Sequence, residues 1–259
     1  MKKEYKVELS ENGLALTKQE KILFGQCGPD KCIHLTEVME YCADLVTDLY
    51  ARRGYDRTFL AEHGYAQMVS RCSFKINSYP KENDEIEVTV QEEKPEGVQF
   101  MRYYRFKDLS TGNILIEGKS LWVVVNPESR AVVLPSKFEF FAASDLQTEC
   151  ECKPSRIKFS GEVQTLGKQK ILYSMTDGNG HLTNAKYINF ALDFLPCEWQ
   201  KRKISAFKLN FCKEIRPGDT MIINALFCSE ESKVFVEGKI ESSLERSFEC
   251  ELSYEPSQE

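Results

Sequence analysis

The segment TDGNGHLTNAKY, residues 176–187, concentrates side chains that could do chemistry in a stretch rich in glycine. It contains Asp177, Asn179 and His181, and the chain has only three histidines. A carboxylate, an amide and an imidazole can orient a water molecule, accept its proton and donate hydrogen bonds to a developing negative charge. A histidine followed by Leu-Thr is also typical of a turn that enters a helix, so this segment alone leaves both interpretations open.

The same pattern occurs a second time, nearer the N-terminus. The first copy, DKCIHLT, begins at Asp30, and the second, DGNGHLT, begins at Asp177. Aspartate and histidine recur at one separation, because 177 − 30 and 181 − 34 are both 147. Similarity at a fixed separation indicates a duplicated structural unit.

The two copies differ in the residues that chemistry would need. In this register Cys32 stands where the second copy has Asn179, and the flanking glycines are missing from the first copy. The first copy therefore lacks both the amide and the backbone freedom of glycine. We expect the second copy to be the site, and His34 to be a structural remnant in a degenerate one.

Each copy leads into a predicted helix. Apolar residues recur at helical spacing over 38–49 after the first copy and over 188–195 after the second, where Pro196 ends the helix. Thr36 and Thr183 occupy the predicted N-cap positions.

Strand patterns follow both helices. Residues 86–90 and 248–254 alternate between apolar and polar, and the run 121–125 is apolar throughout. Turn-forming residues at 110–113 and 229–232 separate the predicted hairpin strands. Each half therefore consists of one helix followed by an antiparallel meander.

These patterns predict an α+β fold of the double hot-dog type, in which two tandem units each pack a long helix on a curled antiparallel sheet. We place an N-terminal unit at 1–136, a linker at 137–155 and a C-terminal, catalytic unit at 156–259.

Length and composition are those of an ordinary globular protein: 259 residues, 42% hydrophobic and 29% charged. No apolar run approaches the roughly 18 residues that a membrane span needs, and the N-terminus MKKEYKVELS lacks the apolar segment of a signal peptide. We expect a cytoplasmic protein with no membrane partner. The net charge of −6 offers no general attraction for nucleic acid. The basic clusters Arg52–Arg53 and Lys201–Lys203 are expected at solvated helix ends or loops.

The ten cysteines are expected to be reduced thiols, because the chain shows no secretory signal and several of them lie in apolar runs. Zinc sites use CxxC pairs or clustered Cys and His. This chain has only Cys150-x-Cys152 and the more widely spaced Cys27 and Cys32. We expect no metal site and no cofactor.

The second half resembles the acyl-acyl carrier protein (acyl-ACP) thioesterases of plants and bacteria. Their signature is an Asp-x-Asn-x-His-x-x-Asn segment that leads into Lys-Tyr and a helix. Asp177, Asn179, His181, Asn184 and Tyr187 match it here.

Two further blocks extend the resemblance over most of the chain. LNFCKEIRPGD (209–219) is similar to the family's strand that ends in a catalytic glutamate, which would be Glu214. GYAQMVSRCSFKINSYPKENDEIEV (64–88) is similar to the family's N-terminal strand segment. The resemblance implies that the thioester of fatty acyl-ACP is hydrolysed to free fatty acid and holo-ACP, with the acyl chain held largely by the N-terminal half. Acyl length would then depend on bulky residues such as Phe100 and Trp122.

In that chemistry Glu214 would be the general base on water, with Asp177 fixing the loop. His181 would orient the water or donate to the leaving thiolate, and which of the two residues removes the proton stays open. Backbone N–H groups at residues 182–186, at the start of the helix, would stabilise the oxyanion. Asn184 and Tyr187 are expected to be supporting residues.

One position departs from the family. A cysteine commonly follows the catalytic glutamate, and this chain has Ile215 there. Cys212, two residues before Glu214, would share its face on a strand, so a Cys212–His181 nucleophilic pair is a rival mechanism.

Alternative functions are an acyl-CoA thioesterase and a non-catalytic acyl-chain-binding protein. A hot-dog dehydratase would need a motif of its own, which the sequence lacks. For the first function, the expected partner is acyl carrier protein, which is acidic and could dock on the Lys201–Lys203 cluster. A homodimer is left open.

Overall fold

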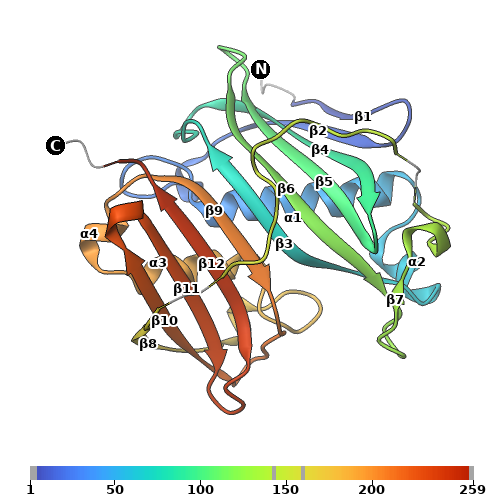
Figure 1. Ribbon diagram of the computed structural model, residues 1–259. Helices are drawn as coiled ribbons and strands as arrows, with labels where there is room; N and C mark the ends of the chain where they lie inside the picture. Colours follow the sequence, from blue (N-terminus) through green and yellow to red (C-terminus); the bar gives the residue numbers. More distant parts are fainter. Residues whose placement is uncertain (1–4, 142–143, 159–160, 257–259) are drawn as a thin grey trace. The chain divides into compact units, whose positions relative to one another are not determined.

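The computed structural model describes residues 5–141, 144–158 and 161–256 of the chain (Figure 1). Residues 142–143 of the expected linker, residues 159–160 and both chain ends lie outside the described residues. The chain divides into two compact units, Met1–Pro154 (unit 1) and Ser155–Glu259 (unit 2). Most of the segment that the sequence suggested as a linker, 137–155, thus belongs to unit 1.

Unit 1 is built on an antiparallel sheet. Its strands lie in the order β1-β2-β4-β5-β6-β3, and the short strand β7 pairs with β6. The strands are β1 (Val7–Leu9), β2 (Ala15–Lys21), β3 (Ala66–Ile76), β4 (Glu85–Glu96), β5 (Gln99–Asp108), β6 (Ile114–Val125) and β7 (Val132–Val133). The helical elements are η1 (Phe24–Gln26), α1 (Leu35–Arg52), α2 (Arg57–Glu62) and η2 (Pro135–Lys137).

The long strands of unit 1 form because apolar side chains alternate with polar ones, which places the apolar set on one buried face. Ile86, Val88 and Val90 on β4 are fully buried, as the sequence predicts. Gly118 on β6 lies beside the ring of Phe74 on β3, and a Cβ atom at Gly118 would overlap that ring. The glycine therefore makes room for a bulky core residue on the neighbouring strand.

The helix α1 covers this buried face. It packs against β2 and β4 and crosses one face of the unit-1 strands in Figure 1. The apolar residues predicted over 38–49 are buried. The helix begins after His34, which takes the N-cap position that we had predicted for Thr36, and Thr36 lies buried inside the first turn.

Unit 2 repeats the arrangement on a smaller scale. Its antiparallel strands lie in the order β9-β12-β11-β10-β8. They are β8 (Gln164–Lys170), β9 (Ile204–Phe211), β10 (Thr220–Cys228), β11 (Lys233–Ile240) and β12 (Arg246–Tyr254). The helical elements are η3 (Tyr173–Met175), α3 (Lys186–Asp193), α4 (Cys197–Gln200) and η4 (Ser229–Glu231).

The main helix of unit 2 is shorter than expected. α3 has eight residues, against 18 in α1. Pro196 disfavours helical backbone at the residue before it, so the chain leaves the helix there and α4 begins just after the proline. At the other end Asn184 and Ala185 form a turn first, and Ala185 rather than Thr183 takes the N-cap position. The prediction of a long helix in both copies is therefore wrong for the second.

The two units share one strand order. The series β2-β4-β5-β6-β3 of unit 1 corresponds to β8-β10-β11-β12-β9 of unit 2. In each unit the main helix connects the two strands at opposite ends of this series, α1 between β2 and β3 and α3 between β8 and β9. A duplicated ancestral unit accounts for this identity of order.

Candidate active site

The glycine-rich loop of unit 2 is a tight turn closed by its own backbone. The N–H of Asp177 donates to the carbonyl of His181 at 3.0 Å, and the N–H of Gly180 donates to the carbonyl of Asp177 at 3.0 Å. The side chain of Asp177 accepts from the N–H of Asn179 at 2.8 Å. Gly180 has a φ of 75°, which other residues rarely adopt. Asp177 therefore shapes the turn that presents His181.

A second segment, far along the sequence, lies against this loop. β9 ends at Phe211, and Glu214 lies in the connection that follows it. The N–H of Leu182, next to His181, donates to the carbonyl of Ile215, next to Glu214, at 3.0 Å. This backbone bond holds the two segments that carry His181 and Glu214 together.

The imidazole of His181 and the carboxylate of Glu214 face each other. Nε2 of His181 lies 3.4 Å from Oε2 of Glu214. The two side chains are 21% and 39% exposed, so solvent or a substrate can reach both. An imidazole and a carboxylate at this distance can share the binding and deprotonation of one water molecule.

Ser247 on β12 holds the segment that carries Glu214. Its hydroxyl donates to the carbonyl of Lys213 at 2.7 Å, and its own carbonyl accepts from the N–H groups of Cys212 at 2.8 Å and Lys213 at 3.1 Å. Ser247 is 1% exposed. The sequence did not single it out, because a serine on the polar face of an alternating strand looks like any solvated residue.

Tyr187 and Asn184 lie behind the loop. Tyr187 is buried on α3, with its ring edge-on to Phe211 and Phe248. Burial above all, with a contribution from the Glu214 carboxylate, raises the pKa of Tyr187 to about 12. Its phenol is therefore neutral at physiological pH. Asn184 begins the turn before α3, and its carbonyl accepts from the N–H of Tyr187 at 3.4 Å.

Cys212 lies in the same connection as Glu214, one residue past the end of β9. The strand alternation that would have put it on the face of Glu214 therefore does not apply. Its exposed thiol donates to the backbone carbonyl of Asn210 at 3.9 Å. The carboxylate of Glu214, by contrast, lies directly against His181.

The equivalent loop of unit 1 has the same backbone in a different register. There the N–H of Gly28 donates to the carbonyl of Cys32 at 2.9 Å, as Asp177 does to His181 in unit 2. The separation is 149, since 177 − 28 and 181 − 32 agree. The isolated bridges Cys27↔Ile33 and Thr176↔Leu182 keep the same separation. The register of 147 that the HLT motif suggested is therefore wrong by two residues.

This register changes which residues correspond. Cys32 occupies the place of His181, and Asp30 rather than Cys32 occupies the place of Asn179. His34 corresponds to Thr183. The two histidines of the HLT motifs, His34 and His181, therefore do not occupy equivalent positions in the two loops. Unit 1 still lacks the imidazole, although for a different reason from the one that the sequence suggested.

The partner of the imidazole is missing from unit 1 as well. The N–H of Ile33 donates to the carbonyl of Pro80 at 2.9 Å, as Leu182 does to Ile215. The residue before Pro80, Tyr79, thus corresponds to Glu214. Neither half of the histidine–glutamate pair is present in the loop of unit 1.

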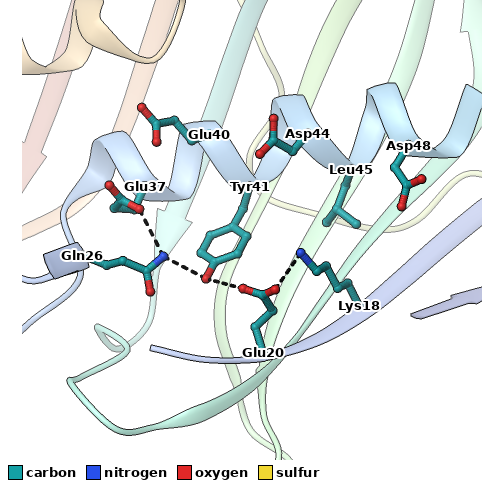
Figure 2. A pocket seen from close by; sticks show the side chains of 9 residues that line it. All are labelled: Lys18, Glu20, Gln26, Glu37, Glu40, Tyr41, Asp44, Leu45 and Asp48. Atoms are coloured by element: carbon teal, nitrogen blue, oxygen red, sulfur yellow. Dashed lines mark hydrogen bonds and ion pairs between the residues drawn. The ribbon is translucent and has the colours of Figure 1, made fainter. Parts of the chain in front are cut away.

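A pocket of about 230 Å³ lies in unit 1 (Figure 2). Five carboxylates line it, those of Glu20, Glu37, Glu40, Asp44 and Asp48. Lys18 pairs with Glu20, and the amide of Gln26 donates to Glu37 and to Tyr41. Over the ranges that the structure describes, no group of three or more His, Cys, Asp or Glu side chains is arranged to hold a metal ion. None of the predicted site residues lines this pocket.

Two family domains match the chain one after the other. Residues 13–136 match the acyl-ACP thioesterase N-terminal domain, and residues 145–254 match the acyl-ACP thioesterase C-terminal domain. The chain belongs to the acyl-ACP thioesterase family. The residues of the candidate site, from Asp177 to Glu214, all lie in the C-terminal domain match.

Curated relatives of this thioesterase family member include two plant proteins. An acyl-[acyl-carrier-protein] hydrolase of Cuphea viscosissima is 25% identical over 173 residues, which cover 63% of this chain and 42% of that protein. A palmitoyl-acyl carrier protein thioesterase of Cuphea hookeriana is 21% identical over 221 residues, 79% of this chain and 52% of that protein. The chain spans about half the length of the curated relatives it matches.

Solved structures agree in fold. An acyl-ACP thioesterase from Bacteroides thetaiotaomicron superposes with a TM-score of 0.84 at 23% identity and covers 95% of this chain and all of its own. A 12:0-ACP thioesterase from Umbellularia californica gives 0.80 at 17% identity, covering 96% of this chain and 100% of its own. Among the residues that the structure describes, none of the helices has the length and apolar character to span a bilayer.

Proposed function

We propose that this protein hydrolyses the thioester of fatty acyl-ACP to free fatty acid and holo-ACP. The observation that carries the proposal is the contact of 3.4 Å between His181 and Glu214, in the unit that matches the family's C-terminal domain. The two Cuphea relatives, an acyl-[acyl-carrier-protein] hydrolase and a palmitoyl-acyl carrier protein thioesterase, support the substrate. We further propose that the two units are tandem hot-dog units, which their common strand order supports.

In the proposed mechanism Glu214 is the general base. It accepts a proton from a water molecule that His181 orients through Nε2, and the water oxygen adds to the thioester carbonyl. When the tetrahedral intermediate collapses, the carbon–sulfur bond breaks, and the thiolate of the phosphopantetheine arm takes up the proton that Glu214 accepted from water, which regenerates the carboxylate. The proposed mechanism needs both Glu214 and His181, and the variants described next test each of them.

The oxyanion needs donors near the start of α3. Of the backbone N–H groups at 182–186, those of Leu182, Thr183 and Lys186 already donate to carbonyls of the protein. The proposed oxyanion donors are therefore the N–H groups of Asn184 and Ala185, at the positive end of the helix dipole. Asn179 on its exposed turn is proposed to bind the substrate carbonyl or the water.

The proposed carrier is acyl carrier protein, docked through the basic cluster at residues 201–203. Arg202 lies over the rings of Trp199 and Tyr254, at 4.4 and 5.0 Å. The exposed charges of Lys201 and Lys203 are then the ones available to an acidic partner. We propose a cytoplasmic enzyme without a cofactor, as a monomer or a homodimer.

The test is hydrolysis of acyl-ACP and acyl-CoA of matched chain lengths by the wild type and by single-site variants. Glu214→Gln and His181→Ala are each expected to lower kcat/KM by about 100-fold or more, as loss of a general base does. Cys212→Ala is expected to retain activity, and Glu230→Gln, an exposed carboxylate on η4, is the matched control.

Each of the other outcomes favours a different mechanism, carrier or function. Undiminished activity in Glu214→Gln removes the proposed mechanism, and activity lost only in Cys212→Ala establishes the nucleophilic rival. Equal turnover of acyl-CoA and acyl-ACP, unaffected by Lys201→Glu and Lys203→Glu, would overturn the proposed carrier. A protein that binds acyl chains and hydrolyses none would be an acyl-chain-binding protein.

A further inference from the structure

A buried cluster of charged side chains lies in the interior of unit 1. Arg102 on β5 and Glu92 on β4 are each 1% exposed. Arg53, at the end of α1, bonds Glu92 through Nη1 at 2.6 Å, and its side chain is 9% exposed. The expectation that Arg53 lies at a solvated helix end is therefore wrong. The hydroxyl of Tyr50 donates to the second oxygen of Glu92 at 2.7 Å.

The charges of this cluster do not balance. Arg53 and Arg102 contribute two positive charges, and Glu92 contributes one negative charge. Burial raises the pKa of Tyr50, so its hydroxyl adds no charge at physiological pH. Both oxygens of Glu92 are engaged by Arg53 and Tyr50, and Arg102 reaches Glu92 only at 3.7 Å. One guanidinium charge is left over, and an uncompensated buried charge is costly.

The hydrogen-bond donors of the cluster do not balance either. Nη2 of Arg102 donates to Oε1 of Gln67 at 2.9 Å. Nε and Nη1 of Arg102, and Nε2 of Gln67, are buried and have no hydrogen-bond partner among the described residues. A guanidinium is planar and offers its N–H groups as a fork that fits the two oxygens of a carboxylate.

The surroundings of these donors are aromatic. The guanidinium of Arg102 lies 4.4 Å from the ring centre of Trp122 and 5.3 Å from that of Tyr50. Tyr50 and Trp122 belong to an apolar cluster with Phe100, Leu60 and Phe138. Stacking on the ring faces offsets part of the cost of burying the cation but satisfies none of its in-plane N–H donors. A ligand that suits this place is anionic at one end and apolar along its length.

We propose that Arg102 and Gln67 bind a carboxylate carried by an aliphatic chain in the interior of unit 1. Two sources have this chemistry: a free fatty acid, through its head group, and an acyl substrate with a second carboxylate at its far end. The second source rests on the proposed function, and the first does not. Both are distinct from the histidine–glutamate site of unit 2.

The first arm of the test measures binding without hydrolysis. Trp199→Phe leaves Trp122 as the only tryptophan, because the chain has two, and Trp122 stacks on the proposed anchor. In this background, dodecanoate is expected to change the emission and to bind at least about tenfold more tightly than 1-dodecanol, since charge-assisted hydrogen bonds are lost with the alcohol. Arg102→Met should abolish that preference.

The matched control is Arg105→Met. Arg105 is three residues further along β5, so it lies on the opposite face of the strand, with its side chain 38% exposed. The control should keep the preference for dodecanoate. Arg102→Lys keeps the positive charge but loses the paired N–H groups of the guanidinium. Gln67→Leu removes the amide N–H donor of Gln67. Each should weaken dodecanoate binding, and these two variants carry the test if Arg102→Met does not fold.

The second arm measures turnover of an acyl-ACP with a carboxylate at the far end of its chain against the plain acyl-ACP of equal length. A preference for the dicarboxylic chain that Arg102→Met abolishes and Arg105→Met keeps identifies a substrate site. Dodecanoate selectivity in the first arm without that preference identifies a site for free fatty acid. Equal binding of acid and alcohol together with no dicarboxylic preference overturns the proposal. If the protein hydrolyses none of the thioesters, the proposed function is wrong. The binding measurements of the first arm still test the carboxylate site.

Discussion

Replacing Ser247 with alanine tests whether the position of Glu214 depends on the strand behind it. Ser247→Ala removes one hydroxyl and leaves the backbone bonds from Cys212 and Lys213 to the carbonyl of residue 247 in place. The bond lost is the one of 2.7 Å to the carbonyl of Lys213, adjacent to Glu214. The hydroxyl also lies 3.4 Å from that of Tyr187. The substitution therefore loosens the segment that carries Glu214 without removing any proposed catalytic group.

The magnitude follows from the burial of the bond. Ser247 is 1% exposed, but Lys213 is exposed and the bond is only partly buried, so its loss costs about 0.5–1.5 kcal/mol. If this free energy is released by displacing Glu214 from His181, kcat falls between about twofold and about twelvefold, because about 1.4 kcal/mol corresponds to a factor of ten. KM should change little, since the substituted side chain is buried behind the segment and away from the proposed binding surface.

The assay is steady-state hydrolysis of acyl-ACP across pH. In Ser247→Ala we expect a lower kcat and a shifted pH dependence of kcat/KM. Ser247→Thr, which restores a hydroxyl, should recover part of kcat. Ser205→Ala is the control, because its hydroxyl also bonds a strand carbonyl of unit 2, that of Ser253 at 3.3 Å. A Ser247→Ala protein that is less stable, but has an unchanged kcat and pH profile, would refute a positioning role.

Three further predictions concern stability. Gly118→Ala should lower the free energy of unfolding by about 1–3 kcal/mol in chemical denaturation, because the new methyl group would overlap a core ring; Gly25→Ala, which meets nothing within 4 Å, should not. Tyr50→Phe should lower it by about 1–3 kcal/mol in the same assay, because Glu92 loses a buried donor. Folding raises the pKa of Tyr187 from 10.0 to about 12, so stability should fall as pH rises between these values. Tyr187→Phe should make that fall smaller, and an identical pH dependence of unfolding in the two proteins would contradict the assignment.

Much of the candidate site could be predicted from the sequence, because its parts are local. The turn around Gly180 needs a residue that accepts a positive φ, and the glycines in the sequence predict such a turn. The strands were predictable because apolar residues alternate on β4 and β12. The contact between His181 and Glu214 could not be predicted from their separation in the sequence. Only the resemblance to the acyl-ACP thioesterases suggested it. The structure adds the backbone hydrogen bond from Leu182 to Ile215, which brings the two segments together.

The errors have physical causes as well. The HLT motif suggested a register of 147 because its short identities stand out in the sequence. The two loops have the same length, and their backbone hydrogen bonds show a constant separation of 149. The length of α3 was overestimated because Leu195, before the proline, continued the apolar spacing. Arg102 was overlooked, although Phe100, Tyr104 and Phe106 share its face of β5 and are all buried. A charged residue on an otherwise apolar strand face was the available signal.

The loop of unit 1 keeps the backbone of the candidate site without its side chains. Its hydrogen bonds match those of the loop in unit 2, and Lys31 keeps a φ of 63° where the other loop has glycine. The chain thus holds a spare scaffold for the same constellation. Exchanging Gly28, Asp30, Cys32 and Tyr79 for Asp, Asn, His and Glu would place the four side-chain types at the equivalent positions of this loop. His34 would have to become Thr as well, because its ring lies 3.2 Å from where a Cβ atom on residue 28 would be.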